Sequence, residues 1–134
     1  MPNRHLLLRL GATAALCLSA ACSGGATGPH APSVSGDWSG ITAFPTQGRS
    51  SSMSLSQSGT SVTGTFSVAG AFADITVTGT VDASGRFSFL APRNCEVWGG
   101  TLTVDGSSMS GPIVIDRSGC TAQSNESATL NLTR

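Results

Sequence analysis

The sequence predicts an all-β domain: an eight-stranded antiparallel up-and-down meander that closes as a barrel, with a β-sandwich as the alternative. Three observations support this prediction. Apolar residues alternate with Ser and Thr at a period of two, turn residues recur about every 12 residues, and no segment shows helical spacing. Because alternate side chains of a strand point to opposite faces, the apolar set predicts the interior and the hydroxyl set the outer wall.

Length and composition favour one folded domain without a nucleic-acid partner. The chain has 134 residues, no lysine and a formal net charge of zero. The arginines of the predicted domain are scattered along the sequence and form no basic patch: Arg49, Arg86, Arg93, Arg117 and Arg134. Ser, Thr and Gly dominate, but apolar residues recur at regular spacing. This is typical of a folded chain, because a disordered one would lack such a pattern.

Residues 1–21 have the three parts of an export signal peptide. Arg4 and Arg9 supply the positive end, an uncharged apolar run follows from Leu10 to Ala21, and its last residues, Ser19-Ala20-Ala21, are small enough for a peptidase cleft. That run is about 12 residues long, shorter than the ~20 that a membrane-spanning helix needs. Export is therefore favoured over the alternative, a permanent transmembrane anchor.

The end of this leader, Leu18-Ser19-Ala20-Ala21-Cys22, resembles the lipobox of bacterial lipoproteins. The resemblance implies that Cys22 becomes the N-terminus and carries acyl chains that hold the protein on a membrane. Ser19 stands where the family usually has Leu, and Ser-Ala-Ala would also serve an ordinary signal peptidase, which leaves a soluble periplasmic or secreted protein as the alternative. Ser23 stands where inner-membrane lipoproteins carry Asp, so the resemblance favours the outer membrane, facing the periplasm.

The cysteine count agrees with lipidation. Cys17 lies inside the leader, so three cysteines remain after export: Cys22, Cys95 and Cys120. Three thiols are an awkward number in an oxidising compartment, and acylation of Cys22 leaves two that can pair. We therefore expect a Cys95–Cys120 disulfide. A redox or metal role is less favoured, since the sequence has no CxxC motif.

Residues 22–33 form a predicted flexible linker between the anchor and the domain at 34–134. The stretch after Cys22 is rich in Gly, Ala, Ser and Pro and has no apolar periodicity. It contains His30, which we expect to be solvated rather than a metal ligand.

The eight expected strands begin at Val34. Pro45 is expected to stop the first and Pro92 the fifth, and Asp105-Gly106 is the strongest hairpin turn. The expected ranges are 34–44, 50–57, 61–69, 72–82, 86–91, 95–105, 108–116 and 126–133.

Two strands have irregular patterns. In the sixth, Val97 is out of phase with Leu102, and Gly99-Gly100 lies between them, which predicts a β-bulge. In the seventh, Pro112 indicates an edge or a poorly paired position, because proline donates no ladder hydrogen bond.

Glycines recur at the centre of an apolar-x-Gly-x-apolar pattern, around Gly64, Gly79 and Gly111. Glycine on an inward face lets a strand coil sharply, which a small closed sheet requires. The alternative is that these are ordinary Gly-rich hairpins.

The first strand opens with Gly36-Asp37-Trp38, and this Gly-x-Trp resembles the start of the calycin superfamily of lipocalins, fatty-acid-binding proteins and avidins. The resemblance implies that Trp38 closes one end of the barrel and that a basic side chain from near the last strand, here Arg134, packs over its ring. The chain departs from the family in lacking a C-terminal helix and further lipocalin motifs. Its strands are also shorter than those of most ligand-holding members, which puts a sizeable cavity in doubt.

The residue inventory gives no sign of catalysis. The predicted domain has no histidine, lysine or tyrosine, its serines have no obvious base, and most carboxylates fall at turns or strand ends. Glu96 lies within a strand beside Trp98 but has no carboxylate partner in the pattern. We expect no enzyme activity, no metal and no cofactor.

The expected function is that of a membrane-anchored binding module for a small apolar ligand, enclosed by Phe66, Phe87 and Phe89. The alternative is a protein-binding or structural envelope lipoprotein, similar in outline to periplasmic protease inhibitors. In either case the membrane is a partner through the acyl chains on Cys22.

Overall fold

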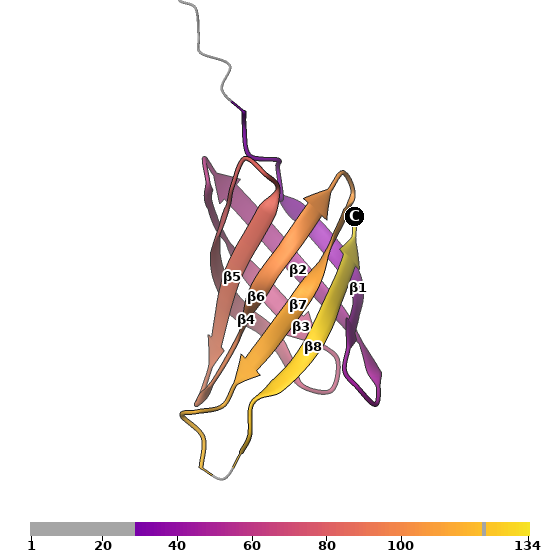
Figure 1. The fold of residues 1–134 in the computed structure, drawn as a ribbon, viewed down its shortest axis with the longest axis vertical. Helices are drawn as coiled ribbons and strands as arrows, with labels where there is room; N and C mark the ends of the chain where they lie inside the picture. The colour runs from indigo at the N-terminus through magenta and orange to yellow at the C-terminus, as the bar shows by residue number, and fades with distance from the viewer. Residues whose placement is uncertain (1–28, 122) are drawn as a thin grey trace, which may run out of the picture.

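The computed structural model describes residues 29–121 and 123–134, and it shows a closed barrel of eight antiparallel strands in sequential order (Figure 1). The signal peptide predicted at 1–21 and the lipidation site Cys22 lie outside the described residues. Within them, no helix is long and apolar enough to cross a membrane. The strands are β1 (Gly36–Ala43), β2 (Gly48–Ser58), β3 (Ser61–Val68), β4 (Phe72–Val81), β5 (Arg86–Arg93), β6 (Glu96–Asp105), β7 (Ser108–Asp116) and β8 (Glu126–Thr133).

Pairing of β1 with β8 closes the sheet. The two strands pair from Ser39 opposite Thr133 to Ala43 opposite Thr129. The predicted meander and its closure are therefore confirmed, and the sandwich alternative is excluded. Closure also removes the exposed strand edges through which open sheets aggregate.

Alternation of side chains separates the interior from the wall, as β2 illustrates. Met53 and Leu55 are buried, whereas the serines between and beside them at 52, 54 and 56 are exposed. The same alternation in the other strands gives one continuous core cluster that includes Trp38, Phe66, Phe87, Trp98 and Leu130.

The prediction of a β-bulge at Gly99-Gly100 was wrong. β6 keeps a single register with β5 and with β7 through both glycines. The inward residue at this level is Trp98, in phase with Leu102, and Val97 belongs to the outer face. The register changes instead between β3 and β4, near Phe66 and Val68, where Asp74 adopts a left-handed φ of 51°. This shift brings Phe72 into contact with the core.

The two prolines are accommodated by gaps in the ladders. Pro92 does not end β5 as predicted; the strand continues to Arg93, which pairs with Glu96. The pairing of β5 with β4 stops at Leu90, so Pro92 has no ladder partner on that side. Pro112 pairs with Thr129 of β8, while the ladder between β7 and β6 is interrupted beside it. Of the two expectations for Pro112, a poorly paired position is confirmed. An edge position is wrong, because β7 has a paired strand on each side.

The barrel has two unlike ends (Figure 1). One, here called the N-terminal end, receives the start of the described chain and also holds Arg134 and the turns after β2, β4 and β6. The other, here called the loop end, holds the connections after β1, β3, β5 and β7, including the long loop 117–125.

The segment before β1 covers the N-terminal end. Val34 is fully buried; its N–H donates to Gln57 Oε1 at 2.7 Å, and the Gln57 N–H donates to Ser35 Oγ at 2.9 Å. Packing against the core begins at Ala31, three residues before the predicted domain boundary at Val34.

Candidate functional site

The predicted closing residues meet at the N-terminal end. Trp38 is 1% exposed and its Nε1–H donates to the Val34 carbonyl oxygen at 2.8 Å. The Arg134 Cζ lies 4.6 Å from the centroid of the Trp38 ring, and its Nη1 donates to the Ser35 carbonyl at 2.9 Å. Gly36, which precedes them, has a φ of 123°, a conformation that residues with a side chain rarely adopt. Side chains and backbone thus cover this end.

The interior is occupied by aromatic rings that contact one another. Phe87 stacks on Phe89 at 5.6 Å between centroids, and Phe89 meets Phe66 edge-on at 6.0 Å. The series continues from Phe66 to Trp98 at 6.1 Å and from Trp98 to Phe44 at 6.1 Å. The three phenylalanines expected to line a ligand site therefore point into the barrel, where they pack against each other. An eight-stranded barrel is just wide enough for its side chains to fill it.

Charged and aromatic side chains form a ring at the loop end. Most of them continue the inward alternation of their strands to, or just past, the strand end: Arg49 follows the phase of Ser51 and Met53, and Arg117 that of Ile113 and Ile115. Phe72 is the exception, because the register shift between β3 and β4 brings it to the core. We call this set the mouth ring: Phe44, Arg49, Phe72, Arg93, Glu96, Arg117 and Glu126.

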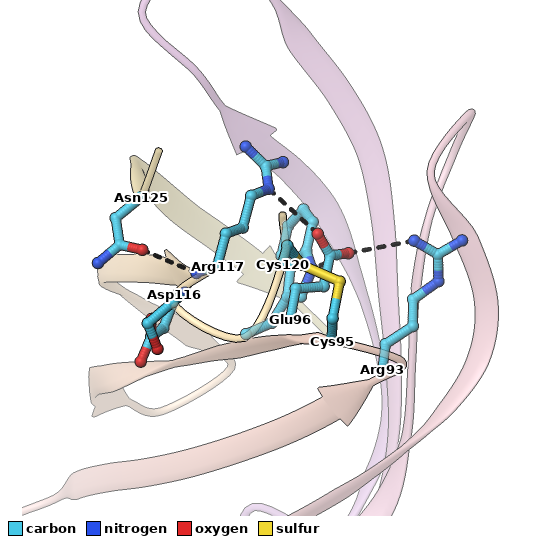
Figure 2. Close-up of a disulfide and its surroundings, with 9 residues drawn as sticks. Arg93, Cys95, Glu96, Asp116, Arg117, Cys120 and Asn125 are labelled. Atoms are coloured by element: carbon cyan, nitrogen blue, oxygen red, sulfur yellow. Dashed lines mark hydrogen bonds and ion pairs between the residues drawn. A yellow bond between two sulfur atoms is a disulfide. The ribbon is translucent and has the colours of Figure 1, made fainter. Parts of the chain in front are cut away.

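Three ion pairs link four members of the mouth ring. Glu96 accepts from Arg93 Nη1 at 3.1 Å through Oε1 and from Arg117 Nε at 3.1 Å through Oε2. Figure 2 shows its carboxylate lying between the two guanidinium groups. Arg117 also pairs with Glu126 at 3.1 Å, and the Trp98 Nε1–H donates to Glu96 Oε1 at 2.9 Å. These four side chains are thereby held relative to one another.

The pKa values of this network follow from its contacts. Burial raises the pKa of Glu96, but hydrogen bonds from Trp98, Arg117 and Arg93 outweigh it, and the pKa lies below the ordinary value of 4.5. The hydrogen bond with Glu96 raises the pKa of Arg117 further above its already high value. Glu96 is therefore an anion at neutral pH although it is 9% exposed.

The predicted disulfide is present and braces the loop end. Cys95 follows β5 and Cys120 lies in the loop after β7, and their Cα atoms are 5.0 Å apart. The bond lies next to Glu96 and Arg117 (Figure 2). The same loop is held by Asn125 Oδ1, which accepts from the Arg117 N–H at 2.7 Å.

Arg49 differs from the other two arginines of the mouth ring. Its Cζ lies 5.7 Å from the centroid of Phe44, and a Cβ placed on Gly70 would come within 3.5 Å of its Nη1. Among the residues that the structure describes, it has no carboxylate partner, whereas Arg93 and Arg117 have one and two.

A small pocket of about 110 Å³ opens beside Arg49 at the loop end, lined by Phe44, Gln47, Arg49, Ala71, Trp98, Arg117 and Glu126. A larger surface hollow lies elsewhere, on the outer wall of β1, β2 and the turn after β3. It measures about 920 Å³, is open to solvent, and its lining is mostly serine, alanine and glycine. The pocket at the loop end is smaller, but it alone of the two combines aromatic and charged groups.

The sequence pattern did not reveal the mouth ring, because its members are far apart in the chain. The arginines seemed scattered, yet Arg49, Arg93 and Arg117 converge at one end. Each of these arginines lies two residues beyond the last inward residue of its strand, at Ser51, Ala91 and Ile115. Continuing the alternation of each strand by two residues would therefore have predicted that all three point toward the mouth. No cluster of His, Cys, Asp and Glu suited to a metal ion occurs in 29–121 or 123–134.

Comparisons with protein-family models, with curated proteins and with solved structures found no match.

Proposed function

We propose that this protein is a bacterial envelope lipoprotein without catalytic activity that binds another envelope protein through the mouth ring. The export leader and the lipobox resemblance around Cys22 support a lipid anchor, on the outer membrane facing the periplasm. Several acyl chains on one cysteine would give stable attachment, where a single chain gives only marginal binding.

The two ends of the barrel give this anchor a direction. Packing of the chain against the core begins at Ala31, over the N-terminal end. In this proposal residues 23–30 of the predicted linker would serve as a spacer, and eight residues reach roughly 28 Å if fully extended. The strand ends that carry the mouth ring lie at the opposite end of the barrel, with the connections after β1, β3, β5 and β7 (Figure 1). The mouth ring would therefore face away from the membrane and toward proteins of the periplasm.

The observation that carries the proposal is the arrangement of the mouth ring itself. Arg and aromatic side chains are the residues that most often anchor protein interfaces. Here, ion pairs already hold Arg93 and Arg117, and a disulfide braces the loop beside them, so ordering these side chains on binding would cost little conformational entropy. The filled interior leaves this end, rather than the inside, as the place for recognition.

Site-specific photo-crosslinking in the producing cell tests this function. A photoreactive residue at Gln47, exposed beside the pocket, is expected to capture one defined envelope protein. The matched probe at Ser107, exposed at the N-terminal end, should not capture it. Equal capture by both probes, or capture of nothing by either, would count against protein binding at the loop end.

A small apolar ligand is the second candidate function. In its favour, the aromatic series that includes Phe66, Phe87 and Phe89 continues to Trp98 and Phe44, which line the pocket at the loop end. Against it, a pocket of about 110 Å³ is well below the ~300–1,000 Å³ of sites that enclose drug-sized ligands. A larger ligand would have to displace the rings.

A further inference from the structure

We propose that the pocket beside Arg49 binds a carboxylate group of the partner protein. This inference rests on the proposed function, because it names the chemistry by which the loop end would recognise that partner. Arg49 is the positioned donor, and Phe44 and Trp98 supply the apolar walls of the pocket.

The charges of the mouth ring favour an anion. The ring contains three arginines, Arg49, Arg93 and Arg117, and two glutamates, Glu96 and Glu126, so three minus two leaves one positive charge. The ion pairs divide the two carboxylates between Arg93 and Arg117. The surplus charge therefore belongs to Arg49, whose guanidinium lies against an aromatic ring rather than an acid.

The shape of Arg49 favours a carboxylate over other anions. A guanidinium presents its N–H donors in a planar fork that matches the two oxygens of a carboxylate. The Arg49 Cζ lies over the Phe44 ring, 5.7 Å from its centroid, and this neighbour helps to orient the fork, which reduces the entropy lost on binding. A single surplus positive charge also matches a monoanion better than a dianionic phosphate.

The size of the pocket indicates that it takes a group rather than a whole molecule. About 110 Å³ is roughly a third of the smallest usual ligand site, so a carboxylate with one or two carbons is an appropriate occupant. An Asp or Glu side chain and a C-terminal carboxylate both meet this description. Glu126 also faces the pocket, but its charge is balanced by Arg117 at 3.1 Å.

The test is an NMR titration of the protein, purified in detergent from the cell that produces it, with signals followed at the Arg49 Nε–H and the Trp98 Nε1–H. Two probes separate the sources of the carboxylate: acetyl-glutamate amide for a side chain and acetyl-alanyl-alanine for a C-terminus. At constant ionic strength we expect at least one of them to give saturable shifts at both signals. Arg49→Gln should weaken its binding about tenfold or more.

Arg86→Gln is the matched control, because it removes the same charge from an exposed position at the N-terminal end and should leave binding unchanged. Equal shifts with chloride, tighter binding of inorganic phosphate than of both carboxylates, or full binding by Arg49→Gln would overturn the inference. The titration needs no partner protein. A negative titration with successful crosslinking therefore rejects the carboxylate alone, and the reverse result rejects the protein partner.

Discussion

Glu96 is the residue on which the loop end most depends. It is 9% exposed, and it accepts hydrogen bonds from two guanidinium groups and an indole. Its removal would leave Arg93 and the Trp98 Nε1–H without their acceptor. Arg117 would keep one of its two ion pairs, that with Glu126. Removing the buried member of such a network is costly, because its partners lose their acceptor.

Glu96→Gln is expected to lower the free energy of unfolding by about 2 kcal/mol, because each lost hydrogen bond to a charged group contributes on that order. Urea denaturation followed by tryptophan fluorescence measures the loss. Glu126→Gln is the control: that side chain is 37% exposed and has one ion pair, so its loss should stay below about 1 kcal/mol. Equal effects of the two variants would contradict the central position of Glu96.

The lowered pKa of Glu96 predicts how this contribution changes with pH. A carboxylate whose pKa is lower in the folded state stabilises the fold above its ordinary pKa, here 4.5, and the stabilisation is lost as the pH falls through the folded value. The stability difference between wild type and Glu96→Gln should therefore be constant from pH 6 to 7 and shrink below about pH 4.5. Denaturation series at several pH values test this, and a difference that grew toward acid would have the wrong sign.

At the scale of the strands, inward glycines let neighbouring strands approach closely. A Cβ on Gly64 would overlap the Ser54 carbonyl oxygen, and one on Gly79 would overlap the Ser88 carbonyl oxygen. The repeated apolar-x-Gly-x-apolar pattern thus marks places where a side chain has no room. This agrees with the expectation that the pattern serves a tightly coiled sheet.

Gly64→Ala is expected to destabilise the protein by about 2 kcal/mol, since overpacking against backbone must move a strand. Gly48→Ala is the matched change in the same sheet, where the nearest atom is Cγ2 of the half-exposed Ile41 at 3.2 Å. It should cost less than about 1 kcal/mol. Thermal unfolding of both variants decides the matter; a milder effect at Gly64 than at Gly48 would refute the close-approach argument.

The strands themselves were largely predictable from alternation, and the differences have local causes. Trp98 and Val97 are neighbouring apolar residues, and the sequence does not show which of them points inward. The predicted bulge depended on an inward Val97, whereas Trp98 is the inward residue. Pro92 was predicted to end its strand because the sequence does not show that the pairing of β5 with β4 stops at Leu90, which leaves room for a proline beyond it. The convergence of Arg49, Arg93 and Arg117 was not predictable from one strand at a time, because barrel closure brings them together.

At the scale of the whole molecule, the disulfide ties the turn after β5 to the loop after β7. Its cysteines are 25 positions apart, and a cross-link of that length stabilises by roughly 3–4 kcal/mol in the entropic model. The double variant Cys95→Ser, Cys120→Ser should therefore melt more than about 10 °C lower than the wild type.

The same variant should also loosen the loop end, because Cys120 lies in the loop that begins with Arg117. Hydrogen exchange is expected to rise first at the Arg117 N–H, which donates to Asn125. It should change little at the N-terminal end, around Trp38. A melting temperature within about 2 °C of wild type would show that the barrel does not depend on the cross-link.

At the scale of the whole barrel, aromatic side chains occupy the interior, and for this reason we propose recognition at the mouth ring. Native mass spectrometry of the protein, released gently from the producing cell, tests this most directly. We predict a mass equal to the processed chain with its covalent acyl groups and no further small molecule. A stoichiometric, non-covalently bound apolar molecule that dissociates on activation would contradict a filled interior and favour the ligand-carrying alternative.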